Sequence, residues 1–263
     1  MRARAEVRGV FERAGRKTRL IDTFETGGLR LRIPNSDDRC EAVVLNTAGG
    51  LAGGDEAHLS FALGRKSNVC LTTQSAEKIY RADDKPAVVA AKIDVGDGAN
   101  LLWMPQETIL FNGSGLSRSL HIDMSESASV IAVEITVFGR VARGERLGAG
   151  VFRDRWRIRR GGSLVFADDV RLEGEISDIV QKAAVGNGVC AIATLVYLSS
   201  KAEKSLQSVR TVLDAKVIDG GASAWNGMLV VRFAAREPLD VRNAVAEVLR
   251  RLSRAALPRV WSI

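Results

Sequence analysis

Short apolar strands recur along the first two hundred residues of this chain, and each follows a turn of glycine or small polar residues. Four apolar cores stand out, at residues 69–71, 101–103, 130–133 and 164–166. They recur at roughly 30 residues, a period that predicts a stacked repeat architecture. A unit of two strands cannot bury its apolar face alone, whereas neighbouring units can bury it together.

A second strand is expected between successive cores, at residues 88–95, 120–124 and 156–158. The repeat is loose, so a β-sandwich is an alternative to a solenoid. From about residue 200 the pattern changes. Apolar residues at helical spacing predict an amphipathic helix over 201–215, then a strand over 228–233. A second helix is expected to open at 238–240 with Asp240 as its N-cap.

The chain is therefore predicted to be mainly β: an irregular β-helix-like (solenoid) stack of short strands with two C-terminal α-helices. We expect a single domain over 1–263. Residues 1–200 would form the β stack, and residues 201–263 would form two helices, one strand and a tail.

A glycine-rich run at residues 45–55 contains two Gly-Gly pairs, with Asp55 directly after the second. Neither the G-x-G-x-x-G spacing nor a Gly-Lys-Ser/Thr ending is present, so the run is not a phosphate loop. The residues that follow alternate like a strand. We expect a backbone bend between two strands, with Asp55 capping the turn.

Composition narrows the function classes. No apolar run is long enough to span a bilayer. The three cysteines are scattered, which fits reduced thiols in a cytoplasmic protein. The net charge is +7, and alternate residues from Arg153 to Arg159 place arginines on one strand face. A solvent-exposed strand face is the simpler interpretation of these arginines. A nucleic-acid-binding stripe is the alternative, and no nucleic-acid-binding motif supports it.

Few residues suggest chemistry. His58 and His121 are the only histidines and lie in different predicted strands, so a histidine-rich metal site is not expected. No nucleophile motif is present, so catalysis is not expected. Glu134 interrupts an apolar strand, where a charge must be paired, protonated or in contact with water. Asp168 begins an acidic pair that follows another strand.

Several segments resemble, in order, the urease accessory protein UreD family. The motifs are Asn-Thr-Ala-Gly-Gly-Leu-Ala-Gly-Gly-Asp at 46–55, Thr-Thr-Gln-Ser-Ala-Glu-Lys-Ile-Tyr-Arg at 72–81, and Leu-Trp-Met-Pro-Gln-Glu-Thr-Ile-Leu-Phe at 102–111. Two shorter ones are Gly-Arg-Val-Ala-Arg-Gly-Glu at 139–145 and Leu-Pro-Arg-Val-Trp at 257–261.

The resemblance implies a non-enzymatic maturation factor, a scaffold or chaperone that binds the accessory protein UreF. UreF in turn recruits UreG, and the assembly docks on urease apoprotein and promotes nickel delivery. It also implies an internal polar passage for nickel, in which Asp55, Glu134 and Asp168 would bind the ion transiently. No permanently bound cofactor, membrane or nucleic-acid partner is expected.

The partner surface is predicted to be the C-terminal helices and tail, with Trp261 as an exposed anchor. The following residues are expected to bind partners or to define the family: Asn46, Thr47, Gly49, Gly50, Gly53, Gly54, Thr72, Thr73, Gln74, Glu77, Lys78, Tyr80, Arg259 and Trp261. The alternative function is a generic β-solenoid module that binds acidic protein surfaces or nucleic acid. An enzyme using Glu134 and Asp55 as acid and base is a third, weaker hypothesis.

Overall fold

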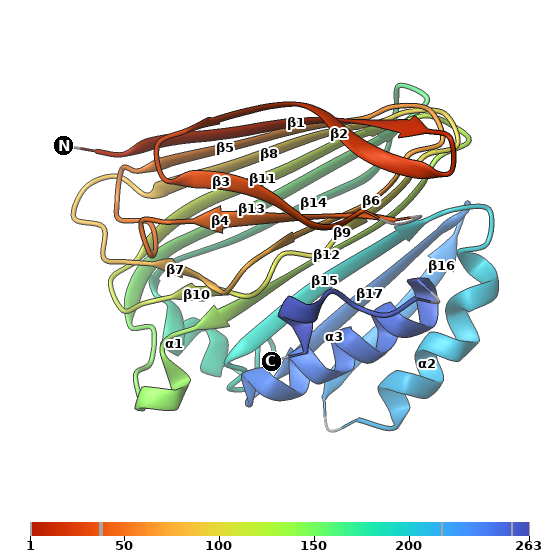
Figure 1. The fold of residues 1–263 in the computed structure, drawn as a ribbon. Coiled ribbons are helices and arrows are strands. Elements are labelled where there is room, and N and C mark those ends of the chain that lie inside the picture. The colour runs from red at the N-terminus through yellow and green to blue at the C-terminus, as the bar shows by residue number, and fades with distance from the viewer. Residues whose placement is uncertain (1, 37–38, 217, 254, 263) are drawn as a thin grey trace.

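The computed structural model describes residues 2–36, 39–216, 218–253 and 255–262 of the chain. Their strands form two sheets that face each other, and helices cover the outer face of one of them (Figure 1).

The first sheet has seven strands. In spatial order they are β14 (Ser163–Glu175), β13 (Ala149–Arg160), β11 (Gly115–Met124), β8 (Ala87–Val95), β5 (Glu56–Leu63), β1 (Arg4–Ala14) and β2 (Lys17–Thr26). The central pairings from β1 to β13 are parallel, and the two edge strands β2 and β14 pair antiparallel.

The second sheet has ten strands. Its main path is β16 (Asp219–Trp225), β17 (Met228–Ala235), β15 (Ala191–Leu198), β12 (Ser129–Phe138), β9 (Asn100–Trp103), β6 (Asn68–Thr73), β4 (Cys40–Asn46) and β3 (Leu29–Ser36). The short strands β7 (Glu77–Ile79) and β10 (Thr108–Leu110) extend it beside β12.

The chain alternates between the sheets as it advances. From β4 it crosses to β5, returns to β6, and repeats the step through β8, β9, β11, β12 and β13. Successive strands in each sheet then pair in parallel, which gives stacked coils. The predicted solenoid is confirmed, because each coil covers the apolar face of the next.

The fourth predicted unit differs from the other three. The cores at 69–71, 101–103 and 130–133 lie in β6, β9 and β12 of the ten-stranded sheet. The core at 164–166 instead lies in β14, which folds back on β13 as a hairpin in the seven-stranded sheet. Leu164 and Val165 are exposed there, so apolar composition alone misplaced this strand.

The two longer helices form a third layer. The helices are α1 (Ile176–Gln181), α2 (Leu206–Asp214) and α3 (Pro238–Ser253), with 3₁₀ turns at η1 (Val141–Arg143), η2 (Glu203–Ser205) and η3 (Arg259–Trp261). Helices α2 and α3 pack on the outer face of the ten-stranded sheet (Figure 1). They are the two C-terminal helices that the sequence predicted. Helix α3 begins at Pro238, so Asp240 lies inside its first turn and the N-cap prediction is wrong. Its carboxylate still complements the helix dipole there.

The protein has two apolar cores, and alternate side chains of the ten-stranded sheet face one or the other. One core fills the space between the sheets, and the other lies between the ten-stranded sheet and α2 and α3. In β12, Ala132 and Phe138 face the first core, whereas Ile131, Val133 and Ile135 face the second. Side chains alternate along a strand, so Glu134 points into the space between the sheets.

Candidate functional site

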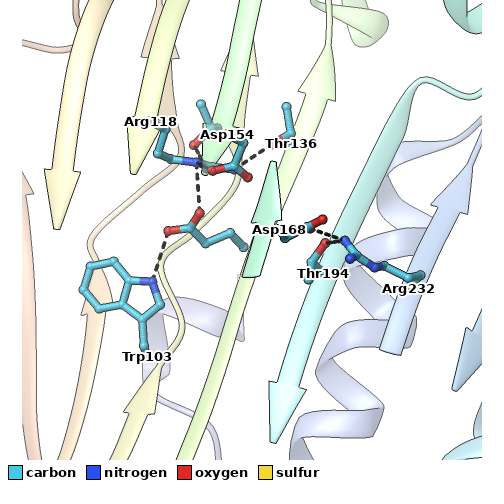
Figure 2. A network of polar contacts seen from close by, with 9 residues as sticks. Trp103, Arg118, Thr136, Asp154, Asp168, Thr194 and Arg232 are labelled. Atoms are coloured by element: carbon cyan, nitrogen blue, oxygen red, sulfur yellow. Dashed lines mark hydrogen bonds and ion pairs between the residues drawn. The ribbon is translucent and has the colours of Figure 1, made fainter. Parts of the chain in front are cut away.

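A polar cluster lies between the two sheets around the side chain of Arg118, which is 6% exposed (Figure 2). Its Nε and Nη2 donate to the two carboxylate oxygens of Asp154 at 3.0 and 2.7 Å. Nη1 donates to the Thr108 hydroxyl and Nη2 also donates to the Thr136 hydroxyl. Its Nε lies 2.9 Å from Oε2 of Glu134. The guanidinium therefore joins β11 and β13 of one sheet to β10 and β12 of the other.

Glu134 is held from both sides. Trp103 Nε1 donates to its Oε1 at 3.1 Å, while the Arg118 guanidinium lies against its Oε2 (Figure 2). Burial raises the pKa of Glu134 to about 7, and the nearby Asp154 carboxylate adds to the effect while Arg118 opposes it. Burial also opposes the charge of Arg118, yet the two carboxylates raise its pKa above the ordinary value, so the guanidinium stays charged.

Asp168 lies in a neighbouring polar group that reaches solvent, since its side chain is 21% exposed and that of its partner Arg232 is 46% exposed (Figure 2). Its Oδ2 accepts a hydrogen bond of 2.7 Å from Arg232, which also donates to the Thr194 hydroxyl. Glu134, Thr194 and Arg232 are direct cross-strand neighbours on β12, β15 and β17. The two groups therefore form one polar row that runs from the buried Arg118 cluster to solvent beside β14, the edge strand of the seven-stranded sheet.

A cavity of about 120 Å³ adjoins the cluster on the other side. Glu134, Arg118 and Trp103 contribute to its lining, and so do Glu77 and Asn46 from two of the family motifs. The Glu77 carboxylate accepts hydrogen bonds of 3.1 Å from the Asn46 amide, and burial raises its pKa. The interior thus holds a further carboxyl group besides Glu134 and Asp154, and the sequence did not reveal its position.

Asp55 has a different role. Its Oδ1 accepts from the Ala3 amide at 2.8 Å, and its Oδ2 accepts from the Ala52 amide at 2.9 Å. The expected turn cap is confirmed. Asp55 is not among the residues that line the cavity, so it is not brought together with Glu134 and Asp168.

The glycine-rich run is the expected bend, and it joins β4 to β5. It packs against the second motif, because the Leu51 amide donates to the Lys78 carbonyl and the Tyr80 hydroxyl donates to the Gly49 carbonyl. Gly50 has a φ of +155°, and a Cβ there would lie 2.4 Å from the Tyr80 ring. Only glycine fits at this position.

The C-terminal motif also packs on the others. The Trp261 indole donates to the Thr72 hydroxyl and to the Met104 carbonyl, at 3.2 and 3.1 Å. Its side chain is 4% exposed, so the prediction of an exposed aromatic in the tail is wrong. Trp261 holds the tail to the chain's own core, while Arg259 beside it is exposed.

The other motif residues lie in the same region. The Thr73 hydroxyl accepts from the Gln106 amide, and Thr47 donates to the Gly28 carbonyl. Gly53 and Gly54 bond through their backbone amides to the carbonyls of Arg81 and Pro86. The cavity wall also includes Gly49, Thr73, Gln74 and Lys78. Whether any of these residues binds a partner stays a prediction.

Three residues that complete the polar row were not predicted from the sequence: Arg118, Asp154 and Arg232. A signal was present in β11, where Arg118 takes the inward place between the buried Leu116 and Leu120. An arginine at such a position must find acidic partners.

The basic face of β13 has the predicted alternation. Trp156 and Ile158 are buried, and the arginines lie on the opposite face. Asp169 pairs with both Arg153 and Arg155, at 3.0 and 3.6 Å. The face therefore carries less net positive charge than its sequence alone indicates.

The described residues hold no group of three or more His, Cys, Asp or Glu side chains placed to bind a metal ion. His58 pairs with Glu56, and His121 is exposed. No helix within the described part of the chain is long and apolar enough to cross a membrane.

The fold and its interior define a class: a two-sheeted β-solenoid with a layer of helices and a buried polar cluster between the sheets. The model of the family described as "UreD urease accessory protein" matches residues 3–262, and the chain belongs to this family. It is therefore an accessory protein of urease maturation, and it works with urease and other accessory proteins.

Relatives support the assignment. The chain is 46% identical to urease accessory protein UreD 2 of Methylorubrum populi over 93% of this chain and 84% of that protein. It is 43% identical to the UreD protein of Methylobacterium sp. strain 4-46, over 94% of this chain and 90% of the relative. With UreD 1 of Bradyrhizobium sp. strain ORS 278 it shares 42% identity, covering 99% and 94% of the two chains.

Proposed function

We propose that this chain is a non-enzymatic scaffold of urease maturation in the cytoplasm. It docks on urease apoprotein together with UreF and UreG, and nickel passes through the space between its two sheets toward the urease active site. The observation that carries the proposal is the set of polar side chains between the two sheets, with carboxyl groups at Glu77 and Glu134 on one cavity and the partly exposed Asp168 beyond them.

The ligand chemistry suits transit. Carboxylate oxygens without thiolate or several imidazoles hold Ni²⁺ weakly, so an ion bound there is readily released. Glu77 and Glu134 line the same cavity, and Asp168 lies further along the row. Asp55 would bind nickel only after releasing the two backbone amides that it now accepts.

The proposed partner surface includes a groove of about 560 Å³ at the start of α3. Tyr80, Phe111 and the exposed Leu239 contribute its apolar lining, and Lys78 and Arg143 add positive charge. An acidic segment with apolar side chains, contributed by an accessory protein, fits this combination. The buried Trp261 supports the surface from below, because Arg242 stacks 4.9 Å from its ring and also lines the groove.

Glu77→Gln and Glu134→Gln test the passage in a host that expresses the urease operon. Each variant should still co-purify with the accessory proteins but should load urease with several-fold less nickel, measured by elemental analysis. Asp94→Asn, an exposed carboxylate on the outer face of β8, is the matched control. Full nickel loading with both buried variants would contradict the passage.

Leu239→Asp tests the groove. It should abolish co-purification with the accessory proteins, because it places a charge in an apolar contact. Leu164→Asp changes another exposed leucine, on β14, and should leave co-purification intact. If the two variants behave alike, the groove is not the partner surface.

A further inference from the structure

Arg118 occupies the space that a cation in transit would need. Its Nε lies 2.9 Å from Glu134, and its Nε and Nη2 engage both oxygens of Asp154 (Figure 2). The remaining nitrogen, Nη1, donates to Thr108. Two buried carboxylates thus share one guanidinium, and both are turned toward it.

A divalent cation cannot share this place. A second positive charge beside a buried guanidinium is strongly repelled, since the surroundings screen poorly. Without the guanidinium, Glu134 and Asp154 would be two facing carboxylates with no cation, the arrangement that a hard or borderline dication neutralises best.

We propose that Arg118 is the gate of the interior: it holds Glu134 and Asp154 closed to divalent cations, and a nickel ion passes only when the guanidinium releases them. This inference rests on the proposed function, because it assigns Arg118 a positioning role in the proposed passage. Once the guanidinium has released it, Asp154 becomes a nickel ligand.

The cavity beside the cluster can accept the Arg118 side chain when it releases the two carboxylates. Arg118 and Glu77 line the same cavity, and the Glu77 carboxylate is hydrogen-bonded there to the neutral amide of Asn46. Among the described contacts the Glu77 carboxyl is hydrogen-bonded to this amide and to no arginine. Movement of Arg118 into the cavity brings the guanidinium toward the Glu77 carboxyl and leaves the first site to the metal.

Arg118→Gln tests the gate in the complex co-purified with the accessory proteins. The variant should unfold at a lower temperature than the wild type, because two buried carboxylates lose their cation. Saturating Ni²⁺ should then restore roughly 5 °C, since a ligand of the folded state stabilises it. The wild type and Arg153→Gln, which removes an exposed ion pair on the outer face, should show no such gain.

Arg118→Gln/Asp154→Asn identifies the ligands. With one carboxylate made neutral, the gain in Ni²⁺ should vanish, and equilibrium dialysis should show one nickel ion fewer than in Arg118→Gln. If the single variant shows no gain, or the double variant keeps it, the gate is wrong. If Arg118→Gln cannot be purified, Arg118→Met, which also removes the charge, should show the same gain in Ni²⁺, and no gain would equally overturn the proposal.

The proposed function is tested separately by the nickel content of urease made with the wild-type chain. Loaded urease together with an Arg118→Gln variant that binds no extra nickel would remove the gate and keep the function. Unloaded urease together with nickel-dependent stabilisation of Arg118→Gln would keep the latent site and remove the delivery role.

Discussion

Replacement of Trp261 by alanine should destabilise the whole fold. The side chain is 4% exposed and makes two hydrogen bonds that join the tail to β6 and to the segment after β9. Truncation of a buried tryptophan to alanine costs about 3–5 kcal/mol through lost burial and the cavity left behind. Trp261→Phe keeps most of the apolar contact and loses the N–H donor, which costs about 1 kcal/mol.

Urea unfolding followed by circular dichroism measures both changes. The matched control is Trp225→Ala at the end of β16, because Trp225 is 45% exposed. We expect the control to cost under about 1 kcal/mol. If Trp261→Ala were no more destabilising than Trp225→Ala, the tail would not belong to the folded core, and an anchor for a partner would again be the better account.

Three further predictions follow from single sites. Because burial raises the pKa of Glu134 to about 7 from 4.5, its contribution to stability is full below pH 4.5 and is lost as pH rises through 7. Glu134→Gln should therefore flatten the fall in unfolding free energy between pH 5 and 8, and an unchanged slope would refute this. Gly50→Ala should destabilise the chain by more than Gly49→Ala, since only the first added Cβ meets other atoms; equal urea midpoints would contradict the clash. Burial raises the pKa of Cys70 to about 12, so a thiol reagent should label the part-exposed Cys190 first, whereas early labelling of Cys70 would contradict its burial.

The recurrence of short apolar segments in the sequence predicted the architecture well wherever one face of the strand packs against a core. The spacing of the cores at 69–71, 101–103 and 130–133 identified three coils, because stacking needs the same apolar face in each. It failed at 164–166, where β14 ends the stack as an edge strand and Leu164 and Val165 are exposed. Composition does not say which sheet a strand joins.

The site was harder to predict than the fold. Glu134 could be singled out because a charge in an apolar strand needs a partner. Its partners Arg118 and Trp103 come from strands that pair with it only in the folded stack, so no spacing in the sequence connects them. Trp261 was misjudged for the same reason: its acceptors lie on residues about 157 and 189 positions away in sequence.

The most direct test of the central claim is the nickel content of urease made with and without this chain. The urease operon is expressed with its own accessory proteins, and the gene for this chain is deleted or supplied. We expect urease apoprotein still to be made without the chain but to hold little nickel. Supplying the chain should restore the nickel content. Full nickel occupancy in its absence would contradict a role in metal delivery.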